Sequence, residues 1–502
     1  MDWRKNEREE ITMMKDKMTS SLKLNFIMNA ILTMSSFIFP LITFPYVSRI
    51  LMPEGTGTVS FATSVVTYFA LFAQLGIPTY GIRACAKVRD DREALTQTAQ
   101  EIFLINCVMS ILTYAVFFAV LFRVPKMQAE KPLFLVISLT IFFNMIGMDW
   151  LYKGLERYMY ITVTSIIFKF IALLAMFALI HEKSEYVIYG GISIFAASAS
   201  NVCNLMNVHK YINLKPMGHY QFGRHMQPIM VFFAMSCATT IYTNLDTVML
   251  GFMKSNTDVG YYNAAVKIKN VLLGVVTSLG TVLLPRASYY VEHHEMEKFH
   301  EITRKAIRFV FLIAVPLMVY FMLFASESVL FLSGEAYIPA ILPMQIIMPT
   351  LVLIGLTNIM GIQMLVPLGQ EKKVLYSEIA GAAVDLILNA ILIPRVASVG
   401  AAIGTLAAEA VVWLVQFAAL KKMVRLAYKE VSYGKITVGV LIGVIASLWV
   451  KNLHIGSFLT LLLSAVLFFG AYGGLLTLLR EPLVWEIEQQ MLGKIFHSSQ
   501  TD

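Results

Sequence analysis

The sequence predicts an all-α membrane protein, a polytopic transmembrane bundle of about fourteen helices. Of its 502 residues, 57% are hydrophobic and 14% are charged, whereas soluble domains average roughly 45–50% and 25%. The hydrophobic residues are concentrated in blocks of about 20, the length that crosses a hydrocarbon core of about 30 Å. The blocks follow one another from Leu24 to Leu479, which leaves no loop long enough for a folded soluble domain.

An even number of spans places both chain ends on the same side of the membrane. The predicted spans are 24–46, 57–78, 100–122, 132–152, 159–180, 186–206, 227–252, 259–285, 305–331, 338–368, 374–394, 398–420, 436–451 and 456–479.

Lysine and arginine in the connecting segments predict the orientation, because cytoplasmic loops carry an excess of both. With the N-terminus inside, the cytoplasmic segments hold 29 of these residues and the outer segments hold 8. We therefore expect both termini in the cytoplasm. Basic loops that face anionic lipid headgroups also account for the net charge of +8, so no nucleic-acid partner is needed.

No motif for soluble chemistry occurs in the connecting segments. They contain no Walker loop, zinc motif or GxSxG elbow, and the four cysteines have no paired spacing. We expect no enzyme activity, no cofactor and no metal centre.

A weak internal repeat predicts two lobes. Residues 55–62, after the first span, and 258–265, after the seventh, both place a short glycine-containing turn before a helix start rich in small residues. Parallel repeats around a central site are a common transporter plan. We expect a basic cytoplasmic segment (1–23), two pseudo-symmetric six-helix lobes around a cavity (24–225 and 226–420), and two added helices with a cytoplasmic tail (421–502).

Ionisable residues inside the predicted spans are the candidate functional residues. Such groups cost at least about 2.5–3.5 kcal/mol at a helix centre and usually face a cavity or a partner. They fall on polar stripes with helical spacing. The stripes contain Lys169 (159–180), Asp246 (227–252), Asn263, Lys267 and Asn270 (259–285), Asp385 and Asn389 (374–394), and Thr405, Glu409 and Gln416 (398–420).

Two interpretations of these stripes remain open. Asp246 can form a structural ion pair with Lys267 or Lys269, and Asp385 and Glu409 can hydrogen-bond between neighbouring helices. Alternatively, the cations face a cavity, where they suit a phosphate or pyrophosphate group, while hydroxyl and amide side chains suit sugars. The residues alone do not decide between an anionic cargo and a cationic drug, because both signs of charge are present.

Several strings resemble the Wzx-like flippases for lipid-linked oligosaccharide repeat units, in the polysaccharide transporter branch of the multidrug/oligosaccharidyl-lipid/polysaccharide (MOP) exporter superfamily. In chain order they are SRILMPEGTG (48–57), LGIPTYGIR (75–83), DWLYKGLER (149–157), NLDTVMLG (244–251), VGYYNAA (259–265) and GAAIGTLAAE (400–409). The resemblance extends from about residue 24 to 420. It departs at Met52, where the family often has glycine.

The resemblance implies a bacterial plasma-membrane flippase that works by alternating access in cell-surface polysaccharide biosynthesis. Its cargo would be an undecaprenyl-pyrophosphate-linked oligosaccharide, moved from the cytoplasmic to the outer leaflet. We expect Arg49, Lys169 and Lys267 to contact the pyrophosphate, Arg83 to attract it at the entrance, and Asn263 and Asn270 to bind its polar groups. Asp246, Asp385 and Glu409 would couple transport to H+ or Na+. Candidate protein partners are a polysaccharide polymerase and glycosyltransferases.

Two other functions remain open. A cation-coupled multidrug exporter of the same superfamily would depend on its acidic residues. A non-transporting scaffold for glycan assembly would tolerate neutralisation of the buried charges.

Overall fold

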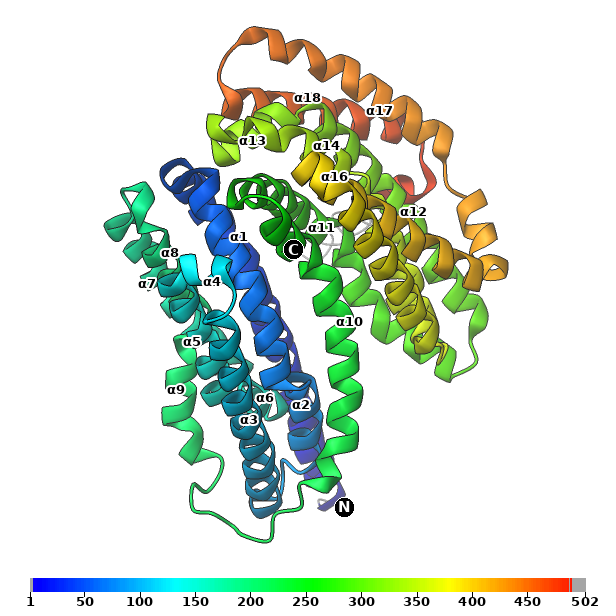
Figure 1. Ribbon diagram of the computed structural model, residues 1–502. Helices are drawn as coiled ribbons and strands as arrows, with labels where there is room; N and C mark the ends of the chain where they lie inside the picture. The colour runs from blue at the N-terminus through cyan, green and yellow to red at the C-terminus, as the bar shows by residue number, and fades with distance from the viewer. Residues whose placement is uncertain (1–2, 487, 490–502) are drawn as a thin grey trace. The chain divides into compact units, whose positions relative to one another are not determined.

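The computed structural model describes residues 3–486 and 488–489, and within this part of the chain every regular element is helical (Figure 1). The chain forms two compact units. Unit 1 contains the residues up to Leu51 and Thr58–Ile241, and unit 2 contains Met52–Gly57 and the chain from Tyr242 onward.

Unit 1 is built from nine helices and the first part of a tenth. They are α1 (Trp3–Gln74), α2 (Ile77–Lys87), α3 (Arg92–Leu121), α4 (Pro125–Ala129), α5 (Lys131–Gly147), α6 (Asp149–Gly154), α7 (Tyr158–Leu179), α8 (Tyr186–Ser198), α9 (Ser200–Asn207) and α10 (Gly223–Met253).

Unit 2 continues from α10 through the C-terminal helices. They are α11 (Asn256–Glu292), α12 (Met296–Leu323), α13 (Ala325–Ser333), α14 (Ile341–Ile347), α15 (Thr350–Thr357), a π-helix (Asn358–Leu365), α16 (Glu371–Lys429), α17 (Tyr433–Leu448) and α18 (Ser457–Leu478).

All fourteen predicted spans fall on apolar helices in the described residues. Nine helices are long and apolar enough to cross a membrane, and two bent pairs of shorter helices pass the same test together. Two long helices, α1 and α16, each contain two predicted spans joined across a break in the backbone. Lys131–Gly147 is a shorter apolar helix. The predicted all-helical, multi-span fold is confirmed. Its orientation in the membrane remains a prediction. Lys494, one of the basic residues on which the orientation was based, lies outside the described residues.

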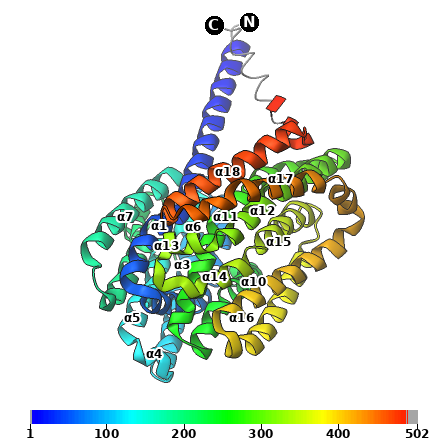
Figure 2. The ribbon, with the colours of Figure 1, turned by 90° about the horizontal axis from the view of Figure 1, so that it is seen from above.

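The C-terminal helices α17 and α18 lie side by side and pack against α12 (Figure 2). Tyr472 of α18 donates a hydrogen bond to the carbonyl of Leu312 (2.8 Å), and Tyr320 of α12 donates one to the carbonyl of Leu461 (2.8 Å).

The two compact units divide inside α10, between Ile241 and Tyr242. The functional lobes expected at 24–225 and 226–420, with added helices from 421, remain a prediction.

The chain passes from unit 1 to unit 2 at a strained residue. Met52 has φ 60° and ψ 177°, a region of backbone space that is essentially restricted to glycine. The segment after it is held in unit 2, where the Thr56 hydroxyl lies 2.6 Å from the Tyr337 hydroxyl. Gly57 lies against the backbone of Asn256 and Gly260, and Gly260 lies against the backbone of Pro53. Neither glycine has room for a side chain. Within unit 2, the chain around the start of the first repeat string therefore packs against the start of the second.

In unit 1, a buried carboxylate fixes the start of α10. Glu101 of α3 is fully buried and accepts hydrogen bonds from Arg224 Nη2 (2.6 Å), His225 Nε2 (2.6 Å) and the backbone N–H of Gln221 (2.7 Å). The other ring nitrogen of His225 lies 2.6 Å from the Tyr80 hydroxyl. A charge buried this completely is tolerated because several donors replace its hydration.

We predict that Glu101→Gln lowers the free energy of unfolding by about 3 kcal/mol, because it leaves the partners of a buried ion pair uncompensated. Thermal unfolding of the purified protein in detergent measures the change. The control is Glu93→Gln, an exposed glutamate in the first turn of the same helix. Equal stability of the two variants would contradict the anchoring role of Glu101.

We also predict that Met52→Gly stabilises the protein by about 1 kcal/mol, because glycine adopts the observed backbone angles without strain. Met52→Ala removes the same side chain but retains the strain, so it is the matched control. A melting temperature of Met52→Gly at or below that of Met52→Ala would show that the backbone there is unstrained.

Candidate functional site

A cluster of buried polar side chains lies inside unit 2, where α10, α11 and both halves of α16 meet. At its centre is Asp246 of α10, which is 5% exposed. Its Oδ1 accepts a hydrogen bond from Asn389 Nδ2 (2.5 Å), and its Oδ2 accepts one from the Thr405 hydroxyl (2.9 Å) and one from the Tyr262 hydroxyl. The carboxylate is therefore held by three neutral donors from three different segments.

The two halves of α16 bring these donors together because they run antiparallel as a helical hairpin. Helical geometry ends at Val396 and Ala397, and Ala397 has a positive φ of 46°. Small residues allow the halves to approach closely (Figure 1): Gly400 lies against the backbone of Leu392 and Ile393, and Gly404 lies against the side chain of Asn389. Such small-residue contacts are typical of packed helices in membranes.

A second carboxyl group lies beside the first. Asp385 is 2% exposed and lies within hydrogen-bonding reach of Asp246. Two negative carboxylates this close repel each other. A shared proton removes one of the charges, and a bound cation offsets the repulsion between them. The pair is therefore chemically suited to bind and release one positive charge.

Two oxygen atoms next to this pair have no hydrogen-bond partner among the described residues. They are Asp385 Oδ1 and Asn389 Oδ1, both buried. Both lie over Gly404, where an added Cβ would be 2.9 Å from Asp385 Oδ1 and closer still to Asn389 Oδ1. An unpaired buried acceptor costs about 1–3 kcal/mol, so these oxygens favour a bound positive charge or a water molecule at this position.

Glu409 extends the cluster along the second half of α16. It is 6% exposed and lies next to the Tyr242 hydroxyl. Lys269 of α11 is close enough to interact electrostatically with both Glu409 and Asp246. The described residues contain no group of three or more histidine, cysteine, aspartate or glutamate side chains that could hold a metal ion. The oxygen atoms of this cluster come from amide and hydroxyl groups as well as from carboxyl groups.

The structure distributes the predicted cationic residues over both units. In unit 1, Lys169 is half-buried in α7 and donates hydrogen bonds to Ser35 Oγ (2.8 Å) and Ser36 Oγ (3.0 Å) of α1. Arg49 is exposed and donates to the carbonyl of Pro45, one turn earlier, while Arg83 is exposed on α2.

The remaining predicted residues lie on α11 in unit 2. Lys267 is partly buried and Asn270 is exposed. The amide nitrogen of Asn263 is buried and has no hydrogen-bond partner among the described residues, so it is available to a ligand.

Three residues with buried polar contacts were not predicted, one in this site and two at the start of α10 in unit 1. Tyr262 lies in one of the family-like strings, but the sequence gives no sign that its hydroxyl reaches Asp246. Glu101 and His225, which hold the start of α10, are separated by 124 positions. The one available signal was Glu101 itself, an acidic residue at the start of an apolar block.

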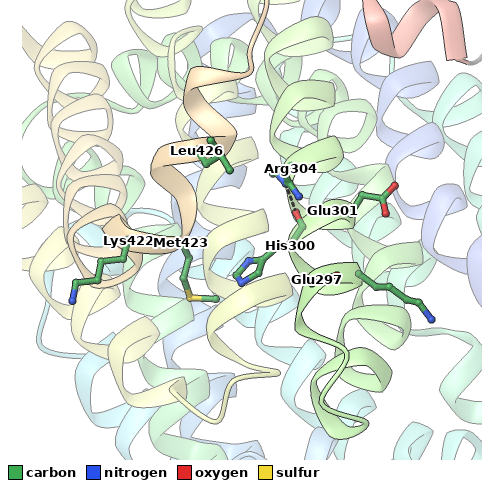
Figure 3. A pocket seen from close by; sticks show the side chains of 8 residues that line it. Glu297, His300, Glu301, Arg304, Lys422, Met423 and Leu426 are labelled. Carbon is green, nitrogen blue, oxygen red and sulfur yellow. Dashed lines mark hydrogen bonds between the residues drawn. The ribbon is translucent and has the colours of Figure 1, made fainter.

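A cavity of about 640 Å³ lies elsewhere in unit 2, between the start of α12 and the end of α16. His300 and Met423 point toward each other across it, whereas Glu301 and Lys422 point to opposite sides (Figure 3). Its charged groups therefore do not converge on a single ligand.

Sequence comparison identifies the family. The profile of the family described as "Polysaccharide biosynthesis protein" matches residues 22–291, more than half of the chain. The chain belongs to this family. A second profile, MatE, matches residues 232–391.

A protein described as "Putative O-antigen transporter" from Escherichia coli (strain K12) is 26% identical over 394 residues, which cover 78% of this chain and 95% of that protein. A protein of the same description from Shigella dysenteriae is 23% identical, over 80% of this chain and all of that protein.

Two solved transporter structures share the fold of this chain. The lipid II flippase MurJ in an inward closed conformation has a TM-score of 0.69 at 15% identity, over 91% of this chain and all of that one. An inward-facing multidrug resistance MATE transporter has a TM-score of 0.62 at 15% identity, over 80% and 99% of the chains. The predicted superfamily is confirmed, and the chain is a multi-pass protein of the bacterial plasma membrane.

We predict that Gly404→Ala destabilises the protein by about 1–3 kcal/mol, because the added methyl group displaces the side chains of Asn389 and Asp385. Gly474→Ala in α18 is the matched control, since no atom lies within 4 Å of its added Cβ. Helix propensity should make that control neutral or slightly stabilising. Thermal unfolding in detergent measures both, and equal stability would argue against a tightly packed cluster.

Proposed function

We propose that this polysaccharide biosynthesis family member is a flippase for a lipid-linked oligosaccharide. Its cargo would be an undecaprenyl-pyrophosphate-linked repeat unit, moved from the cytoplasmic to the outer leaflet by alternating access. The headgroup of such a lipid cannot cross hydrocarbon unaided, because its charges and hydroxyls would lose their hydration. A protein that moves it must offer cations and hydroxyl or amide groups at membrane depth.

The observation that carries the proposal is the state of Lys169. It lies in the middle of a 22-residue apolar helix, and the contacts that hold its ammonium group are two neutral serine hydroxyls. No carboxylate lies within 4 Å of it among the described residues. A structural ion pair would neutralise this charge, whereas hydroxyl contacts leave it able to attract an anion. The interpretation of Lys169 as a phosphate contact is therefore favoured over a purely structural one.

The other predicted residues have supporting roles in this proposal. Arg49 and Lys267 add positive charge for the pyrophosphate, and exposed Arg83 attracts it at the entrance. The free amide of Asn263, together with Asn270, contacts the sugar or phosphate oxygens. The pair formed by Asp246 and Asp385, with Glu409 nearby, couples transport to H+ or Na+ by binding one positive charge in one state of the cycle.

A multidrug exporter of the same superfamily is the second candidate. It is favoured by the MatE profile over residues 232–391 and by the fold shared with the inward-facing MATE transporter. It predicts that transport depends on Asp246 and Asp385 and is insensitive to Lys169.

We predict that Lys169→Ala reduces glycan export about tenfold or more, because a charged hydrogen bond contributes about 1.5–3 kcal/mol. The measurement is complementation of a flippase-deficient bacterium that makes a matching glycan, with surface glycan and lipid-linked oligosaccharide both quantified at equal membrane abundance. Lys169→Arg should restore most of the export.

Lys183→Ala, which removes an exposed lysine after the same helix, is the control and should export normally. Full export by Lys169→Ala would contradict the assignment of Lys169 as a phosphate contact. If the unchanged protein supports no glycan system but extrudes cationic drugs, the exporter is the correct function.

A further inference from the structure

A pocket of about 230 Å³ lies in unit 1, where α3, α9 and residues 211–222 meet. These residues lead from α9 to α10 and are called the α9–α10 segment below. Most side chains that line the pocket are hydrophobic, and a few polar groups lie among them, which is typical of a ligand site. The lining includes Phe103 and Leu104 of α3, Leu205 of α9 and Leu214 of the α9–α10 segment, together with Gln100 and Tyr220.

One amide of α3 holds the α9–α10 segment in place where it passes the start of that helix (Figure 1). Gln100 Nε2 donates hydrogen bonds to the carbonyls of Asn213 (2.8 Å) and Lys215 (2.9 Å). Its Oε1 accepts hydrogen bonds from the backbone N–H of Met217 (3.2 Å) and from the Tyr220 hydroxyl (2.9 Å). The amide thus uses both of its donors and both of its acceptor positions on this segment. The wall of the pocket is therefore formed before any ligand binds.

Three predicted spans end at this pocket. Gln100 begins the span 100–122, Leu205 lies at the end of 186–206, and Met148, which also lines the pocket, lies near the end of 132–152. In the predicted orientation all three ends face the cytoplasm. The pocket therefore lies at the level of the headgroups and first methylene groups of the inner leaflet.

Exposed hydrophobic and basic side chains lie together beside the pocket. Leu214 is 64% exposed, and Met206 at the end of α9 is 71% exposed. Lys215 is exposed between the lining residues Leu214 and Pro216, and Lys210 is exposed just before the α9–α10 segment. Exposed hydrophobic side chains next to lysines are typical of surfaces that bind anionic lipids.

We infer that this pocket binds an acyl chain of an anionic glycerophospholipid of the inner leaflet, with the lipid phosphate near Lys215 and Lys210. The hydrophobic wall takes the first methylene groups of the chain, and the ammonium groups attract the phosphate. The isoprenoid tail of the proposed cargo suits the pocket less well, because most of such a tail lies deeper in the hydrocarbon than the headgroup level. The inference does not depend on which cargo is moved.

A lipid bound here stabilises the start of α10. The α9–α10 segment that forms the pocket wall also contains Gln221, whose backbone N–H donates to Glu101, the buried carboxylate that fixes this helix end. A ligand that binds only the folded segment lowers its free energy and therefore favours the anchored state.

The test is titration of the purified full-length protein in detergent with dioleoylphosphatidylglycerol, with the dissociation constant measured by native mass spectrometry. Dioleoylphosphatidylcholine, which has no net charge, should bind about fivefold more weakly, because each lysine near an anionic headgroup contributes about that factor. Lys215→Ala should remove this difference. Lys183→Ala is the matched control, since it removes an exposed lysine from the opposite end of the predicted spans, and it should retain the difference.

A second pair of variants tests the pocket itself. Leu205→Trp should weaken the binding of both lipids about tenfold, because the larger side chain takes the space of about two methylene groups. Val202→Trp is the matched control: Val202 lies on the same helix and is 40% exposed, as Leu205 is, but it does not line the pocket. Thermal unfolding shows whether both variants are folded. If Leu205→Trp is not, the comparison of Lys215→Ala with Lys183→Ala decides the inference.

Three results would overturn the inference. Equal affinity for the two lipids would show that the site does not select an anionic headgroup. Equal affinities of folded Leu205→Trp and Val202→Trp would show that the lipid binds outside the pocket. Displacement of dioleoylphosphatidylglycerol by a lower concentration of undecaprenyl phosphate would assign the pocket to an isoprenoid tail.

Discussion

The structure of unit 2 depends on how one buried carboxylate is satisfied in a medium without water. Asp246 receives hydrogen bonds from Tyr262, Asn389 and Thr405, which lie on α11 and on the two halves of α16. In hydrocarbon no solvent can replace a missing donor, so each of these segments must be in its observed place at once. The hydrogen-bond requirement of a single side chain thereby fixes three helical segments around α10.

That arrangement is possible because glycine allows the halves of α16 to touch. Gly381, Gly400 and Gly404 each face a side chain or backbone of the opposite half at a distance that excludes a Cβ. Close approach brings short polar side chains such as Asn389 within reach of Asp246. The same closeness places the oxygens of Asp385 and Asn389 over Gly404, where they are buried without a hydrogen-bond partner among the described residues. Tight packing and unmet hydrogen-bonding capacity have one cause.

Sequence periodicity was sufficient for the helices and for the polar faces, since both follow from a repeat of about 3.6 residues. It placed Asp385, Asn389, Thr405 and Glu409 on polar stripes, and the structure buries Asp385, Asn389 and Glu409, with Thr405 partly buried. The gap between the predicted spans 374–394 and 398–420 gave the position where α16 folds back, but not the backbone angles of Val396 and Ala397 that form the turn. Nor could periodicity pair Glu101 with His225, since contacts between distant positions are decided by packing and not by local pattern.

A buried positive charge and a buried negative charge are both hydrogen-bonded to neutral groups, and this is relevant to how the protein could bind ions. Lys169 in unit 1 is hydrogen-bonded by serine hydroxyls, and Asp246 in unit 2 by phenol, hydroxyl and amide groups. Direct ion pairing would have satisfied either charge, but it would also have locked it. Neutral hydrogen-bonding groups, acceptors for Lys169 and donors for Asp246, stabilise a charge while leaving it free to attract an ion of opposite sign. A protein that binds an anionic headgroup at one point and a small cation at another needs charges held in this manner.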